Sequence, residues 1–465
     1  MRYVLMALMA ACSLLGQPYD VVLMKGRAMD PETNLDAVRD IAISGNRIAA
    51  ISASPLRGRV EIDAAGMVVA PGFVDLHQHS QTPEAYRYKA MDGVTTALEL
   101  EVGVSRVSEW YAAREGKALI NFGATSGHIP ALKAIMHEAY DGLVPRDAGV
   151  NRAPTAEEGR GILNSVRQGL DQGALGIGIG LAYTPKVPRG QVLELFELAA
   201  QRHVPVYVHV RSGGPVEPGG IAALQEVLAD VLLSGAQLHV AHITTTGRQE
   251  TSTVLKMIEE ARNRGFDVTT EAYPYSAAAT DIASEALADG WQARAGIDYG
   301  DLQWAATGER LTADTFARYR KQGGIVVMHM IPEEMARLAV ADPTVMIASD
   351  GIIENGKGHP RAAGTYARVL GQYVREQQAL SLMEALRKMS LLPAQLLAIH
   401  SKGRLQVGSD ADIAVFDPKR VIDRATYDNP AQYSEGIQYV LVGGVFVVRD
   451  GKLVDGVAPG RGIRR

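Results

Sequence analysis

The sequence predicts an α/β fold: a (β/α)8 barrel with a small β-sandwich domain that both chain ends build. Three observations predict it. The chain has 465 residues, more than one barrel of about 250 residues needs. Short apolar runs alternate with helix-like segments through its middle, as in βα units. Both ends are instead rich in short strand-like runs separated by Gly, Asn and Asp turns.

The domain bounds follow from the change between short strand-like runs at the chain ends and alternating strand-like and helix-like segments in the middle. We place the barrel at residues 71–400 and the β-sandwich at residues 18–70 together with 401–465. In the C-terminal part, Gly443-Gly444 and Asp450-Gly451 are hairpin turns between apolar runs. The two chain ends are therefore expected to meet in one domain beside the barrel.

The middle of the chain offers nine strand-like runs for eight barrel positions. They are residues 68–76, 94–100, 118–122, 175–181, 204–209, 237–243, 267–272, 325–330 and 345–348. One run must therefore lie outside the barrel. Helical periodicity predicts helices at residues 157–172, 190–202, 220–234 and 380–399.

Composition excludes some classes of function. Hydrophobic residues make up 47% and charged residues 21%, as in a globular protein with a large core. The formal net charge is -5 and no basic stripe occurs, so nucleic-acid binding has no support. A small molecule is the expected partner, and a homo-oligomer is left open.

The N-terminus resembles a targeting segment. One positive charge precedes about a dozen apolar residues, so we predict a signal peptide at residues 1–17. Within it, Met9-Ala10-Ala11-Cys12 resembles a lipoprotein cleavage box. We expect export to the periplasm or lipid anchoring in the cell envelope, and a cytoplasmic protein if the leader stays uncleaved. Cys12 is the only cysteine, which excludes an intrachain disulfide, and no other segment suits a transmembrane helix.

The tripeptide His77-Gln78-His79 is the strongest chemical signal. It follows the apolar run Val68–Leu76, which suits a buried strand of a parallel barrel. Side chains at i and i+2 point to the same side of an extended strand. Both imidazoles can therefore reach one metal ion.

Other ionisable side chains stand where later strands end. In parallel barrels the reactive residues lie at these carboxyl ends, so the side chains should gather. Because burying them is costly unless they are paired or metal-bound, we predict a site for one or two divalent ions. Alternatives stay open: Glu99 for Glu101, His239 for His242, and a turn-capping role for Asp350. The predicted ligands are His77, His79, Glu101, His209 and His242, with Asp350 as the catalytic residue.

With these residues the chain resembles the amidohydrolase superfamily, and within it the N-acyl-D-amino-acid deacylases, especially the N-acyl-D-glutamate deacylase branch. The matching stretches are "PGFVDLHQHS", "DGVTTALELEVG", "LGIGIGLAYTP", "DVTTEAYPY", "YGDLQWAATGERLT", "HPRAAGTYARVL", "LLPAQLLAI", "KGRLQVGSDADIAVFDP" and "PGRGIRR". They cover nearly the whole chain from residue 19 onward. The resemblance implies a metal-bearing barrel that hydrolyses linear amides of N-acyl-D-amino acids.

Two positions depart from the family pattern. Many members place a cysteine ligand after the "GVTT" strand, near Val102 here, so Glu101, with Glu99 as the second choice, must supply any ligand at this strand end. No lysine stands at this strand end, which excludes a carbamylated lysine there. The lysine that usually follows the later histidine is replaced by Thr244, so the pattern does not fix the preferred substrate side chain.

The chemistry follows from these parts. Zinc is the default ion for a His/carboxylate hydrolytic site, and such an ion provides hydroxide near neutral pH. Asp350 is expected to act as general base and then general acid. The resemblance assigns the substrate's α-carboxylate to Arg361, whose guanidinium suits it. The other candidate substrate contacts are Tyr183, Tyr273, Tyr275 and, for an acidic side chain, Arg211.

Three alternatives compete with a deacylase. The same scaffold supports dipeptidases, cyclic-amide hydrolases and lactonases. A non-catalytic scaffold protein should have lost ligands that this chain retains. A metal-binding export protein would not need Asp350 or Arg361.

Overall fold

The computed structural model describes residues 19–140 and 142–465. The leader predicted at residues 1–17, with Cys12, lies outside the described residues. Among the described residues, no helix combines the length and the apolar character that crossing a membrane would require.

Eight parallel strands form a nearly closed barrel, as predicted. Their order in the sheet is β16-β12-β11-β10-β9-β8-β7-β6. Between β16 and β6, single contacts replace a ladder: the Gly351 amide donates to the His77 carbonyl, and the His79 amide donates to the Gly351 carbonyl. The strands are β6 (Phe73–Asp75), β7 (Val94–Val104), β8 (Asn121–Gly127), β9 (Ile177–Gly180), β10 (Val206–His209), β11 (Leu238–Val240), β12 (Val268–Ala272) and β16 (Val345–Ile347).

The ninth strand-like run lies outside the barrel. It contains β15 (Ile325–Met328), which pairs antiparallel with β13 (Ala278–Asp281) and β14 (Leu302–Trp304). This small sheet belongs to the long insertion after β12, and the hairpin β17 (Ile353–Glu354) and β18 (Lys357–Gly358) follows β16. A short apolar run does not reveal its pairing partner, so the sequence could not identify the extra strand.

The run 68–76 was predicted as one barrel strand, and this is wrong. The structure divides it at Gly72 into β5 (Val68–Pro71), which joins another sheet, and β6 of the barrel. A Cβ on Gly72 would lie 2.2 Å from the Thr95 side chain, so only glycine lets the chain pass this close. Both halves are fully buried, which gave them one continuous apolar pattern.

The two chain ends share one nine-stranded sheet, as expected of a common domain. Strand β1 is paired with β2 on one side and with β4 and then β5 on the other, and β5 pairs with β19. Residues of both ends pack in one core, for example Leu23, Val69 and Ile413. Its strands are β1 (Tyr19–Asp30), β2 (Leu35–Ser44), β3 (Arg47–Ser52), β4 (Gly58–Asp63), β5, β19 (Ile413–Phe416), β20 (Ile437–Val442), β21 (Val445–Arg449) and β22 (Lys452–Leu453).

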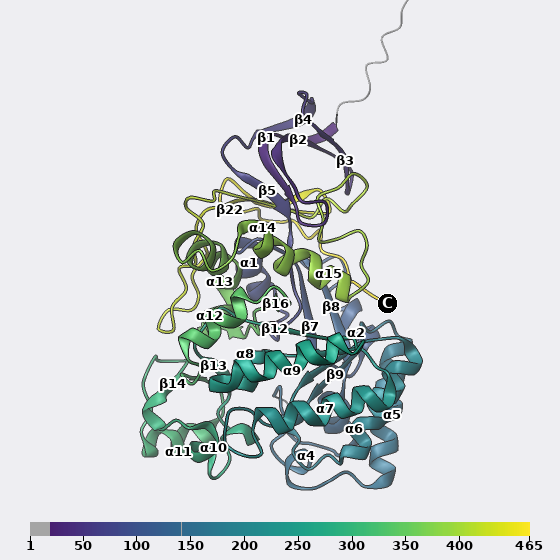
Figure 1. Ribbon diagram of the computed structural model, residues 1–465, viewed down its shortest axis with the longest axis vertical. Coiled ribbons are helices and arrows are strands. Elements are labelled where there is room, and N and C mark those ends of the chain that lie inside the picture. The colour runs from purple at the N-terminus through teal and green to yellow at the C-terminus, as the bar shows by residue number, and fades with distance from the viewer. Residues whose placement is uncertain (1–18, 141) are drawn as a thin grey trace, which may run out of the picture.

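Helices surround the barrel below this sheet domain (Figure 1). Helix α5 begins at a Thr155/Glu158 capping box, and α7 ends at Gly235 in the left-handed conformation. The run predicted at 380–399 is helical in three parts, with a π-helical turn at Arg387–Leu391 between α14 and α15. The helices are α1 (Pro83–Met91), α2 (Val107–Ala112), α3 (His128–Ile135), α4 (Ala148–Asn151), α5 (Ala156–Asp171), α6 (Arg189–Arg202), α7 (Gly220–Ser234), α8 (Ile243–Gly247), α9 (Thr251–Asn263), α10 (Trp291–Ala295), α11 (Ala313–Gln322), α12 (Glu333–Ala341), α13 (Arg361–Arg368), α14 (Leu382–Leu386) and α15 (Leu392–Leu396).

Candidate metal and substrate site

The ionisable side chains predicted at the strand ends gather at one end of the barrel. His77 and His79 follow β6, and Glu101 lies in β7. His209 ends β10, and His242 lies between β11 and α8. The backbone of His242 is left-handed, with φ of 30°, and so is that of Asp350 after β16, with φ of 49°. Such conformations are unfavourable for residues other than glycine and concentrate at functional sites.

Glu101 joins two pairs of histidines. Its Oε2 lies 2.9 Å from His77 Nε2 and 3.2 Å from His79 Nε2. Its Oε1 lies 2.5 Å from His209 Nδ1 and 3.5 Å from His242 Nε2. One carboxylate therefore stands between two sets of nitrogen ligands.

The two remaining ring nitrogens of the first pair also face carboxylates. His79 Nδ1 lies 3.0 Å from Glu99, and His77 Nδ1 lies 2.5 Å from Glu271. Glu99 thus contacts the outer side of one histidine, whereas Glu101 contacts all four. Hydrogen bonds of this kind fix the orientation of metal-binding imidazoles.

Sequence reasoning missed Glu271, and it kept His239 as an alternative to His242. Glu271 stands in β12, where an acidic residue in an apolar strand was the available signal. His239 binds the same Glu271 carboxylate, at 3.1 Å, and Thr269 instead of the cluster around Glu101.

Asp350 completes the cluster. Its Oδ1 lies 3.2 Å from His79 Nε2 and 3.5 Å from His77 Nε2. Its Oδ2 forms an ion pair of 2.8 Å with Arg361, whose side chain is fully buried. The Arg361 guanidinium also lies over the Tyr273 ring, 4.3 Å from its centroid. Arg361 therefore holds one edge of Asp350 while the other edge faces the histidines.

Electrostatics keep the carboxylates of this cluster ionised. Burial by itself would raise the pKa of Asp350, but Arg361 and His77 hold it well below its usual range. Burial likewise opposes ionisation of Glu271, yet the neighbouring His77 and His239 lower its pKa to about 2. Burial would lower the pKa of His77, but Asp350, Glu271 and Glu101 raise it well above its usual value.

The donor set fits one or two divalent ions. Three groups of side chains each bring three ligand atoms within 4.8 Å of one another. Imidazole nitrogens and carboxylate oxygens are the ligands that zinc takes in catalytic sites. The buried His242 Nδ1 has no hydrogen-bond partner in the described part of the chain. The groups are His77, His79 and Glu101; His77, His242 and Asp350; and Glu101, His209 and His242.

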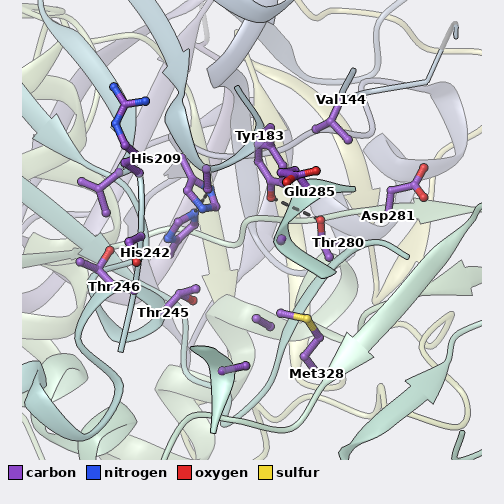
Figure 2. A pocket seen from close by; sticks show the side chains of 18 of the residues that line it. Val144, Tyr183, His209, His242, Thr245, Thr246, Thr280, Asp281, Glu285 and Met328 are labelled. Atoms are coloured by element: carbon purple, nitrogen blue, oxygen red, sulfur yellow. Dashed lines mark hydrogen bonds between the residues drawn. The ribbon is translucent and has the colours of Figure 1, made fainter. Parts of the chain in front are cut away.

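The cluster opens into a cavity of about 530 Å³. Figure 2 shows His209 and His242 beside each other on its wall, with Tyr183 nearby; the Tyr183 and His209 ring centroids are 4.8 Å apart. The size is that of a small-molecule site, for which about 300–1,000 Å³ is usual. Apolar residues such as Val144 and Met328 also line it.

The predicted substrate contacts are placed differently from one another. Tyr183 and Arg211 line the cavity, whereas Tyr273, Tyr275 and Arg361 are buried outside its lining. The Tyr273 hydroxyl is bonded to Thr245, and the Tyr275 hydroxyl donates to Asp423. The Arg211 guanidinium forms a bidentate ion pair with Glu226, at 2.7 to 3.1 Å, and donates to the Pro185 carbonyl.

Comparison with known proteins agrees with this geometry. The profile of the Amidohydrolase family matches residues 60–177 and 221–448. An N-acyl-D-glutamate deacylase of Alcaligenes xylosoxydans xylosoxydans is 31% identical over 92% of this chain and 93% of its own length.

Two solved structures are similar over their whole length. One is the N-acyl-D-glutamate deacylase of Bordetella bronchiseptica, complexed with zinc and a phosphonate inhibitor that mimics the tetrahedral intermediate. It is 28% identical, with a TM-score of 0.82 over 97% of this chain and 100% of that one. The other is a D-aminoacylase studied for its binuclear metal centre, 26% identical, with a TM-score of 0.82 over 96% and 100% of the two chains. The resemblance found in the sequence is confirmed, and the chain belongs to the amidohydrolase family.

Proposed function

We propose that the protein hydrolyses the amide bond of N-acyl-D-amino acids, with N-acyl-D-glutamate as its best substrate. The products are a carboxylate and a free D-amino acid. The observation that carries this proposal is the cluster of four histidines around Glu101, with Asp350 beside it, at the end of a substrate-sized cavity. The deacylases to which the chain is similar support the substrate class.

The metal ion belongs among the side chains already described. His77, His79, Glu101, His209 and His242 would hold it, with Asp350 at the edge. A zinc ion there supplies a Lewis acid for the scissile carbonyl and lowers the pKa of water toward neutrality. Glu99 and Glu271 contact the Nδ1 atoms of His79 and His77, so the Nε2 atoms of these two rings are the ones that would hold an ion.

Asp350 is the general base and then the general acid of the proposed reaction. Its carboxylate is ionised and has one oxygen directed at the histidines. From this position Asp350 accepts a proton from the attacking water and then delivers it to the departing amine. Arg361 holds the carboxylate in place through its ion pair.

Two nitrogens of Arg361 have no partner among the described residues. Its Nε and Nη1 are buried without a hydrogen-bond acceptor, whereas its Nη2 forms the ion pair with Asp350. A buried guanidinium with unused N–H groups is stabilised by a second carboxylate. Arg361 lies outside the lining of the cavity and its side chain is fully buried, however, so this geometry does not support the contact with the substrate's α-carboxylate that the sequence predicted for it.

The direct test is hydrolysis of N-acetyl-D-glutamate, its L enantiomer and N-acetyl-D-leucine by zinc-loaded and by chelator-treated protein. We expect zinc-dependent release of D-glutamate and no cleavage of the L form. Cleavage of N-acetyl-D-leucine alone would support the deacylase reaction and contradict the preference for an acidic side chain. If zinc binds and none of the three is cleaved, a dipeptidase, cyclic-amide hydrolase or lactonase activity replaces this proposal.

A further inference from the structure

Arg248 lies in the wall of the substrate cavity. It follows α8, six residues after His242, and its side chain is largely buried, with the residue 8% exposed. Its backbone is left-handed, with φ of 49°, a conformation that favours glycine. Gly214 packs against the guanidinium, and a Cβ at that glycine would lie 2.8 Å from Arg248 Nη1. The fold thus holds an arginine here at a conformational cost.

The Arg248 guanidinium has no carboxylate partner among the described residues. Its Nη1 donates to the carbonyls of Arg294 and Ala295, at 3.3 and 2.8 Å, and its buried Nε has no acceptor. Burial lowers the pKa of Arg248 to about 10, and the only opposing influence is Tyr273. A buried cation without a counter-charge is unstable unless an anion reaches it.

The other guanidinium groups of the cavity wall are satisfied in other ways. Arg211 and Arg189 both face Glu226, at 2.7 and 3.5 Å. Arg294 donates to two main-chain carbonyls and is exposed, so water can solvate it. Arg248 is therefore the cation of this wall that is both buried and free of a carboxylate, among the residues that the structure describes.

The position of Arg248 suggests which of the two carboxylates of an acidic substrate it binds. Arg361 contacts Asp350, at the reacting end of the site. Arg248 instead contacts the end of α10, in the insertion after β12, and none of its hydrogen bonds reaches the metal-ligand cluster. Arg248 lines the same cavity as His209 and His242, so a substrate whose amide lies at the metal-ligand cluster would reach Arg248 with a longer acidic side chain.

We propose that Arg248 binds the side-chain carboxylate of an acidic N-acyl-D-amino acid. This inference rests on the proposed deacylase function and deepens it. It assigns the acidic preference to Arg248 in place of Arg211, which the sequence suggested and which Glu226 already neutralises.

The test compares kcat and KM of the zinc-loaded full chain on N-acetyl-D-glutamate and on its neutral analogue N-acetyl-D-glutamine. Wild type should prefer glutamate. Arg248→Gln should lower kcat/KM for glutamate by about 10- to 100-fold, mainly through KM, since a charge-assisted hydrogen bond is lost. Glutamine hydrolysis should change by less than about threefold, because its amide makes no ion pair with Arg248. Arg248→Lys should restore part of the loss.

Arg211→Gln is the matched comparison, and it should change both rates by the same factor. An equal loss for both substrates in Arg248→Gln, or a selective loss in Arg211→Gln, overturns the assignment. If Arg248→Gln loses zinc or its fold, the wild-type ratio decides: no preference for glutamate over glutamine overturns the proposal. A wild-type chain that cleaves no N-acyl-D-amino acid instead overturns the proposed function.

Discussion

At the scale of single residues, the barrel contains a histidine that does not belong to the metal cluster. His128 begins α3, is fully buried, and has no partner for either ring nitrogen among the described residues. Burial, with Arg211 nearby, lowers its pKa from 6.5 to about 4. The folded protein therefore keeps this imidazole neutral, while the unfolded chain protonates it below pH 6.5.

This difference makes stability depend on pH. Between pH 6.5 and about 4 the unfolded state binds the extra proton, so the free energy of unfolding falls as pH falls, by about 3 kcal/mol across this window. His128→Leu removes the titrating group. Between pH 6.5 and about 4 the variant should therefore lose about 3 kcal/mol less free energy of unfolding than wild type does. Urea unfolding of both proteins at pH 4 to 8 measures it, because the other titrating groups cancel in the difference.

The exposed His400 provides the control. His400→Leu should change the free energy of unfolding by no more than about 0.5 kcal/mol, as expected for a surface substitution. Parallel curves for wild type and His128→Leu would show that His128 is protonated in the folded protein.

Some features of the site could be predicted from single residues in the sequence, and others could not. The order of polar side chains at strand ends predicted which residues would gather, because parallel strands place their carboxyl ends together. It did not show that Glu101 contacts both histidine pairs, that Glu271 supports His77, or that Glu226 neutralises Arg211. These contacts depend on which side chains meet across neighbouring strands, and spacing along one strand does not record that.

At the scale of elements, Asp75 connects the two strands between which the barrel closes. At the end of β6 it accepts hydrogen bonds from the Ser349 amide and hydroxyl beyond β16, at 2.9 and 2.6 Å. It also forms an ion pair of 2.8 Å with Lys89 of α1, and both side chains are fully buried. Asp75 therefore replaces part of the missing β16–β6 ladder, two residues before His77.

Removing this carboxylate should be costly. Asp75→Ala leaves Lys89 charged and unpaired in the interior, which should lower the free energy of unfolding by about 3–5 kcal/mol. Urea unfolding measures the loss. Combining Asp75→Ala with Lys89→Met removes both buried charges and should recover most of it.

The surface pair of Arg27 and Asp36 is the matched control. Both side chains are about half exposed, so Asp36→Ala should cost less than about 1 kcal/mol. A double variant no more stable than Asp75→Ala would mean that the hydrogen bonds to Ser349, and not the buried charge of Lys89, govern the loss.

Predicting elements succeeded where periodicity is local and failed where an element's partner is distant. The helix predicted at residues 220–234 has the bounds of α7, since its apolar face and Gly235 both lie within the segment. The single strand predicted at 68–76 is wrong because its two halves belong to different sheets. Only the close packing of Gly72 on Thr95 separates them, and that contact is tertiary.

At the scale of the whole molecule, a metal ion would tie together five strands of the barrel. Its ligands come from the ends of β6, β7, β10, β11 and β16. Without an ion these side chains still bind one another, since Glu101 contacts the histidines and Asp350 pairs with Arg361. The fold should therefore survive metal removal, with less resistance to unfolding.

We expect chelator-treated protein to keep the circular dichroism spectrum of the zinc-loaded form and to unfold at lower urea. An ion that binds only the folded state stabilises it by about 2.7 kcal/mol at 100 times its Kd, so the midpoint should rise with the logarithm of zinc concentration. Glu101→Gln weakens contact with both histidine pairs and should reduce this rise strongly. Among the histidines of the cluster Glu99 contacts His79, and it also accepts hydrogen bonds from the Val102 and Gly103 amides, so Glu99→Gln should reduce zinc affinity by about 10- to 100-fold while keeping the response. Loss of the folded spectrum on chelation would mean that the ion, and not the side-chain pairing, holds these five strand ends together.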